Sequence, residues 1–255
     1  MKRALFIALA FAAAIPGSAL AADLPLPAEP VYKALPPPVY NWTGCYIGGG
    51  GGYGMWNQDS HVNSPAGVPI SLTTTNGGRG WFGQGQAGCD YQFTAPIFNV
   101  NAIIGAFGDY DFDSLTGTSN TPLGVGSENQ SSSWSAGLRA GWLVTPRFLS
   151  YFDGGYTQAR FDQVNYTPIG VAPFSLAAQT YNGWFIGSGF EYALDILPIS
   201  GLFLKTEYRY SSYNSANVPF LTTATGVANG LTLNSTKFTQ MISTELVWRF
   251  NWFGH

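Results

Sequence analysis

Charged and apolar side chains alternate strictly near the end of the chain, and this alternation limits what the chain can fold into. In segment 202–210, Lys205, Glu207 and Arg209 alternate with leucine, threonine and tyrosine residues. Neighbouring residues of a β-strand point to opposite faces, so the three charges share one face and the large apolar side chains share the other. Segment 237–250 repeats the pattern. This alternation is typical of strands that cross a membrane.

The same period-2 pattern divides most of the chain into strands of roughly ten residues. Eight such runs can be placed, at 44–56, 80–93, 98–112, 133–144, 148–158, 181–194, 202–210 and 237–250. The connections between them alternate between short ones, at 94–97, 145–147 and 195–201, and long ones, at 57–79, 113–132, 159–180 and 211–236. This layout predicts an all-β fold, an eight-stranded antiparallel transmembrane up-and-down β-barrel. We expect short periplasmic turns, four long extracellular loops and both termini in the periplasm.

The barrel must be closed, because every backbone amide needs an internal partner in hydrocarbon. A charge at the lipid midplane costs about 2 to 4 kcal/mol, so charged side chains are expected to face the lumen. An eight-stranded barrel is only wide enough for its interior to be filled by side chains, and we expect the charges there to neutralise one another. The same cluster could instead conduct ions, or carry catalysis. The candidate lumen charge cluster consists of Asp109, Arg139, Asp153, Glu191, Lys205, Glu207, Arg209, Glu245 and Arg249.

The N-terminus carries the features of an export signal. A basic start precedes an apolar run at 4–15 and a small-x-small sequence at 19–21, which predicts a signal peptide over 1–21. A proline-rich segment follows, and it predicts an extended periplasmic leader over 22–41. The barrel is then expected over 42–255.

Export places the two cysteines in a compartment where disulfides persist. If both face outward, an antiparallel register that places Cys45 opposite Cys89 also places Tyr53 opposite Trp81. Direct cross-strand partners lie within reach of a disulfide. The alternative is two free thiols that face the lipid.

Several functional classes find no support in the composition. The net charge of −3 and the lack of a basic run argue against nucleic-acid binding. A hydrolase usually needs a histidine near a nucleophile, and the two histidines are His61, in the first long connection, and His255, at the C-terminus. Neither falls on a predicted strand, so we expect no enzymatic activity. No spacing of histidines and cysteines indicates a metal site or a cofactor.

Five motifs together resemble the small outer-membrane porin-like proteins of alphaproteobacteria, often called outer-membrane immunogenic proteins. The motifs are YNWTGCYIGG at 40–49, QAGCDYQ at 86–92, GSGFEY at 187–192, KTEYRY at 205–210 and VWRFNW at 247–252. The resemblance implies an eight-stranded barrel with surface-exposed loops and no enzymatic activity. It also implies that a terminal aromatic residue, Phe250 or alternatively Trp252, is read by the barrel-assembly machinery. The chain departs from the family pattern at Cys45, Cys89, Phe107 and Gly137, and so we expect a thinner lumen network.

We therefore expect an integral outer-membrane barrel with a structural and surface-display role in the cell envelope. The alternative is a small passive porin for ions or small solutes. The expected partners are outer-membrane lipid and lipopolysaccharide, the barrel-assembly machinery during biogenesis, and peptidoglycan through the leader.

Overall fold

The computed structural model describes residues 40–96, 99–168, 170, 172–194 and 201–250. They belong to one compact unit, Val39–His255. The predicted signal peptide, nearly all of the predicted leader, and His255 lie outside the described residues. Among the described residues no helix is long and apolar enough to cross a membrane.

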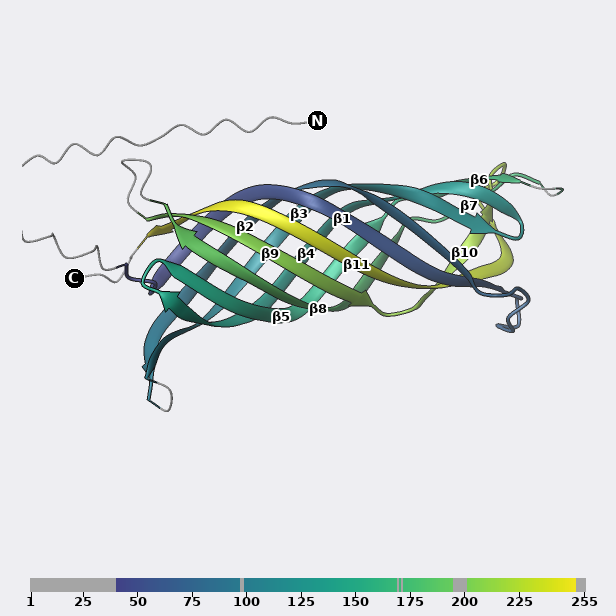
Figure 1. The fold of residues 1–255 in the computed structure, drawn as a ribbon. Helices are drawn as coiled ribbons and strands as arrows, with labels where there is room; N and C mark the ends of the chain where they lie inside the picture. Colours follow the sequence, from purple (N-terminus) through teal and green to yellow (C-terminus); the bar gives the residue numbers. More distant parts are fainter. Residues whose placement is uncertain (1–39, 97–98, 169, 171, 195–200, 251–255) are drawn as a thin grey trace, which may run out of the picture. The chain divides into compact units, whose positions relative to one another are not determined.

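Eight strands form a closed antiparallel ring (Figure 1). Each pairs with the next along the chain, and pairing of the first with the last closes the ring. The ring consists of β1 (Gly44–Asn63), β2 (Thr74–Ala95), β3 (Val100–Thr121), β4 (Gly124–Thr145), β5 (Phe148–Phe161), β8 (Gln179–Ala193), β9 (Leu202–Tyr213) and β11 (Ala228–Phe250). The predicted eight-stranded up-and-down barrel is confirmed, and each predicted strand overlaps one strand of the ring.

The predicted bounds of the long connections are wrong, because much of their length is sheet. β1 continues to Asn63 and β2 begins at Thr74, whereas the prediction had a loop from 57 to 79. β3 and β4 reach Thr121 and Gly124 and leave only a tight turn. The predicted strands ended where the outward apolar residues end. The backbone pairing continues beyond that level, because polar outward side chains are compatible with strands outside hydrocarbon.

Three short strands extend the barrel beyond β5, β8 and β9, at the end that we call the loop end (Figure 1). We call this extension of the barrel the second storey. The three short strands are β6 (Val164–Pro168), β7 (Phe174–Leu176) and β10 (Ala216–Thr222). β6 pairs with β4, β7 joins β6 to β10, and β10 pairs with β11. At the loop end, β6, β7 and β10 therefore form a second closed ring with β1 to β4 and β11. In this ring they replace β5, β8 and β9.

A hydrophobic core fills the second storey. Tyr166 stacks on Phe174 with ring centroids 4.8 Å apart, and Phe220 packs against both rings. The hydroxyl groups of Tyr166 and Ser119 are hydrogen-bonded at 2.8 Å, and burial raises the pKa of Tyr166 far above its usual value, so this hydroxyl stays neutral. The buried residues of this loop-end core are Val62, Val164, Tyr166, Phe174, Leu176, Val218, Phe220 and Leu233.

Below the second storey the outer face carries two aromatic bands separated by smaller and aliphatic residues. In the band nearer the loop end, Tyr53 packs against Trp81 with ring centroids 5.0 Å apart, as the predicted register requires. In the other band Trp248 packs against Phe250. Such bands mark the two interfaces of a membrane. The exposed large apolar side chains between them define the lipid-facing belt.

Glycines on β2 make room for large rings from β1. Gly78 lies opposite Trp56, and a Cβ at Gly78 would come within 2.6 Å of the indole ring. Gly88 likewise lies opposite Tyr46, whose hydroxyl would be 2.5 Å from a Cβ there. The glycine-rich strands therefore admit bulky side chains into a narrow lumen.

This packing predicts different results for two Gly→Ala substitutions on β2. Gly78→Ala should destabilise the barrel by about 1 to 3 kcal/mol, because the fully buried Trp56 ring must move. Gly85→Ala is the matched control, because a Cβ there meets no atom within 4 Å. Urea unfolding of the refolded protein in detergent micelles measures both. Equal stability of the two variants would contradict the packing described.

Candidate functional site in the barrel lumen

The inward-facing charges lie at three levels, and the level nearest the short turns is fully paired. Here Arg139 binds both oxygens of Asp90, and Arg249 reaches Asp90 at 2.7 Å. Glu191 accepts from Arg249 at 2.9 Å and from Arg139 at 3.3 Å. The ring of Tyr46 lies against both guanidinium groups, at 4.6 and 4.9 Å. This turn-end tier of two carboxylates and two arginines is electrically neutral.

The middle tier is built around Lys205, Glu207 and Arg209 of β9. Glu207 binds Lys205 at 2.8 Å and Arg209 at 2.7 Å. Arg209 also binds Asp109 of β3 at 2.9 Å, and Lys205 reaches Glu245 of β11 at 3.3 Å. These contacts join β9 to its neighbour β11 and, across the lumen, to β3. Phe107 of β3 packs beside both cations.

The loop-end tier is a single ion pair surrounded by aromatic rings. Lys237 binds Glu128 at 2.8 Å and donates to the amide oxygen of Gln58. The ammonium group lies 4.0 Å from the centre of the Phe161 ring and 4.9 Å from that of Trp56. Cation–π contacts of a desolvated ammonium group are worth about 2 kcal/mol, which supports the lysine in this apolar surrounding.

The buried charges of the described residues do not balance. Nine buried carboxylates face five buried cations, and the turn-end and loop-end tiers are each neutral. The middle tier therefore carries the whole excess of four negative charges if all its groups are ionised. Three of its carboxylates take part in no salt bridge among the described residues: Asp111, Asp113 and Asp153.

The structure places all nine residues of the candidate cluster in the lumen, each less than a tenth exposed. The candidate cluster omits four further acidic residues and one lysine that also lie in the lumen. Asp90, Asp111 and Lys237 lie on predicted strands and alternate in step with the cluster, so the same argument could place them in the lumen. The argument could not place Asp113 and Glu128, because both lie in the segment 113–132 that was predicted as a loop. The omitted residues are Asp90, Asp111, Asp113, Glu128 and Lys237.

The cysteines and histidine singled out in the sequence lie away from this cluster. Cys45 and Cys89 are direct cross-strand partners on the outer face of β1 and β2, and they form a disulfide. His61 lies within β1 rather than in a loop. No group of three or more histidine, cysteine, aspartate or glutamate residues among those described has the geometry of a metal site.

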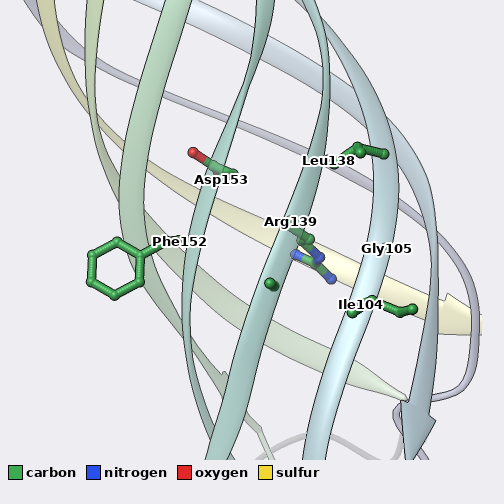
Figure 2. A pocket seen from close by; sticks show the side chains of 7 residues that line it. Ile104, Gly105, Leu138, Arg139, Phe152 and Asp153 are labelled. Atoms are coloured by element: carbon green, nitrogen blue, oxygen red, sulfur yellow. The ribbon is translucent and has the colours of Figure 1, made fainter.

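One hollow belongs to the outer wall and not to the lumen. It has a volume of about 540 Å³ and lies over β3, β4 and β5. Figure 2 shows Ile104, Leu138 and Phe152 around it, and all three are exposed members of the apolar belt. The hollow therefore opens onto the lipid-facing side.

Three layers of packed side chains fill the lumen between its two ends. The charged tiers are interleaved with two hydrophobic clusters, centred on Tyr46 and Tyr151 near the turns and on Trp56 and Phe161 higher up. The loop-end core then closes the second storey. A closed ring with an apolar outer belt and a filled polar lumen defines the protein as an eight-stranded transmembrane β-barrel of the bacterial outer-membrane class.

The sequence model of the outer membrane protein beta-barrel domain family matches residues 7–250. The chain belongs to this family, and its place is the bacterial outer membrane. It is 29% identical over 224 residues to the 31 kDa outer-membrane immunogenic protein of Brucella melitensis, with 83% of this chain and 88% of the relative covered. The resemblance noted from the motifs is thus confirmed.

Two solved structures are also similar to the chain. OprG of Pseudomonas aeruginosa has 12% sequence identity and a TM-score of 0.43, with 82% of this chain and 97% of that protein covered. Ail of Yersinia pestis has 13% identity and a TM-score of 0.31, with 78% of this chain and 99% of that protein covered.

The pairing of the tiers predicts opposite effects for two charge-removing substitutions. Glu191→Gln should destabilise the barrel by about 3 to 5 kcal/mol, because it leaves Arg139 and Arg249 with Asp90 as their only carboxylate. Asp153→Asn should leave stability unchanged or raise it, because it removes a buried carboxylate without a salt bridge. Urea unfolding in micelles measures both. A loss with Asp153→Asn as large as that with Glu191→Gln would contradict the distinction.

Proposed function

We propose that this protein is a plugged barrel with a structural and surface-display role in the outer membrane, without a conducting channel. The observation that supports this most directly is the filling of the lumen by packed side chains. Charged tiers and hydrophobic clusters occupy its length, and the loop-end core is built from residues less than a tenth exposed. The alternative of a passive porin requires an aqueous path through side chains that contact one another.

The proposed orientation places the loop end outside the cell and both termini in the periplasm, as in outer-membrane barrels with long external connections. The second storey would then be the displayed surface. Its closed sheet makes that surface firmer than four free loops, because backbone groups there are paired with one another. Outer-membrane lipid and lipopolysaccharide would contact the belt, the barrel-assembly machinery would read Phe250, and the leader would reach peptidoglycan.

Planar-bilayer recording tests the absence of a channel. The refolded protein, shown to be folded by its heat-modifiable mobility on a gel, should give no steady conductance steps. A matched variant that replaces Tyr166, Phe174 and Phe220 with alanine removes the loop-end core but leaves the two lower layers, and it should also stay closed. Reproducible conductance of the unmodified protein that changes with Glu207→Ala or Arg139→Ala would support the porin instead.

We also propose that the protein has no enzymatic activity. His61 is half-buried within β1 and is the one histidine among the described residues. The refolded protein should hydrolyse neither phospholipid nor peptide substrates above the rate of the empty micelle. Turnover that His61→Ala abolishes, while the heat-modifiable mobility stays unchanged, would overturn this proposal.

A further inference from the structure

A small cavity lies in the middle tier, at the level where the lumen carries its excess negative charge. Its volume is about 10 Å³, which is room for one water-sized particle. The lining residues include Gln84, Asp111, Glu207, Arg209 and Ser243. The cavity therefore lies where two strands of the ring, β2 and β3, face β9 and β11 across the lumen.

Two oxygen atoms around this cavity have no hydrogen-bond partner. Gln84 and Asp111 are direct cross-strand partners on β2 and β3, and they are 7% and 3% exposed. Oε1 of Gln84 and Oδ1 of Asp111 are both buried without a partner. A buried acceptor without a donor costs free energy, and two such acceptors on one cavity indicate that something positive belongs between them.

The charges around the cavity favour a cation over a neutral molecule. Glu207 and Arg209 also line it, but Arg209 is already paired with both Asp109 and Glu207. Asp111 accepts one hydrogen bond, from Ser133 at 3.2 Å, and that hydroxyl also donates to Asp113 at 2.8 Å. Ser133 thus holds two carboxylates without salt bridges close to each other. No cation of the described residues forms a salt bridge with either of them.

We propose that the middle tier binds one hard metal cation in this cavity, with Asp111 and the amide oxygen of Gln84 as ligands. Carboxylate and amide oxygens are the ligands that cations of the Ca²⁺ class prefer. The net charge of the tier favours a divalent ion over a monovalent one, and Asp113 strengthens the site through its charge. The cation would have a structural role, since the packed lumen leaves it no path of conduction. This structural role rests on the proposed plugged lumen, whereas the binding of the ion does not depend on whether the barrel conducts.

Equilibrium dialysis against radioactive Ca²⁺ tests this proposal directly. The refolded protein is first washed with chelator, and choline chloride keeps the ionic strength constant. We expect uptake of one Ca²⁺ per barrel. Asp111→Asn should weaken this uptake at least about tenfold. Asp59→Asn, which alters an exposed carboxylate of β1 bonded to Thr75, should leave it unchanged.

Unfolding by urea gives a second readout that keeps the test decisive if binding is slow in the closed barrel. Refolding in Ca²⁺ should raise the unfolding midpoint of the unmodified protein and of Asp59→Asn, but not that of Asp111→Asn. Gln84→Leu, which removes the amide oxygen without a change of charge, should reduce the effect in the same way. Without added Ca²⁺, Asp111→Asn should be at least as stable as the unmodified protein.

Three results would overturn the proposal. The first is a lack of Ca²⁺ uptake together with a midpoint that no metal cation moves. The second is equal uptake by the unmodified protein and Asp111→Asn, which would place the ion elsewhere. The third is a midpoint that responds to pH but not to Ca²⁺ at any pH, which would mean that protons compensate the excess carboxylates. A midpoint that follows Na⁺ and depends on Asp111 would support the same site with a monovalent ion.

Discussion

Closure of the sheet is the constraint on which the rest of this structure depends. In hydrocarbon a strand edge would leave backbone groups without partners, and the pairing of β1 with β11 removes that edge. Closure with eight strands also sets the width of the lumen. The interior can then hold side chains and little else, and each inward residue must pack against residues from strands across the ring. The glycines opposite Trp56 and Tyr46 follow from this width, because two large side chains cannot occupy the same level of one pair.

A narrow lumen makes the pairing of charges as important as the packing. A buried charge is tolerated when its partners are close and its remaining hydrogen bonds are made, and the turn-end tier meets this condition with two arginines between two carboxylates. Lys237 meets it with one carboxylate and several rings. The middle tier has three carboxylates beyond what its salt bridges use. The distribution of charge is therefore uneven along the lumen, and the imbalance lies beside a cavity of atomic size.

The second storey changes how the long connections contribute to function. A barrel that crosses the membrane needs only about ten residues per strand, whereas β1 to β4 here have 20 to 22 residues. Their extra length, together with β6, β7 and β10, encloses a hydrophobic core above the belt. Segments that are polar in composition thus form a folded cap, with aromatic residues such as Phe174 and Phe220 inside. This cap and the filled lumen below it explain why a structural role fits the molecule better than transport.

The sequence by itself determined the class of fold, the number of strands and the face of most charges, since each follows from alternation within one strand. The shared face of Lys205, Glu207 and Arg209 could be predicted from their own strand, without knowledge of the neighbouring strands. Even the opposition of Cys45 and Cys89 followed from one assumed register. The tertiary structure alone decided which charges meet, because Arg139 and Asp90, or Lys237 and Glu128, come from strands that are not neighbours in the pattern. It also decided that the connections fold into sheet, because outside hydrocarbon a polar strand and a polar loop have similar compositions, and only pairing with β4 and β11 distinguishes them.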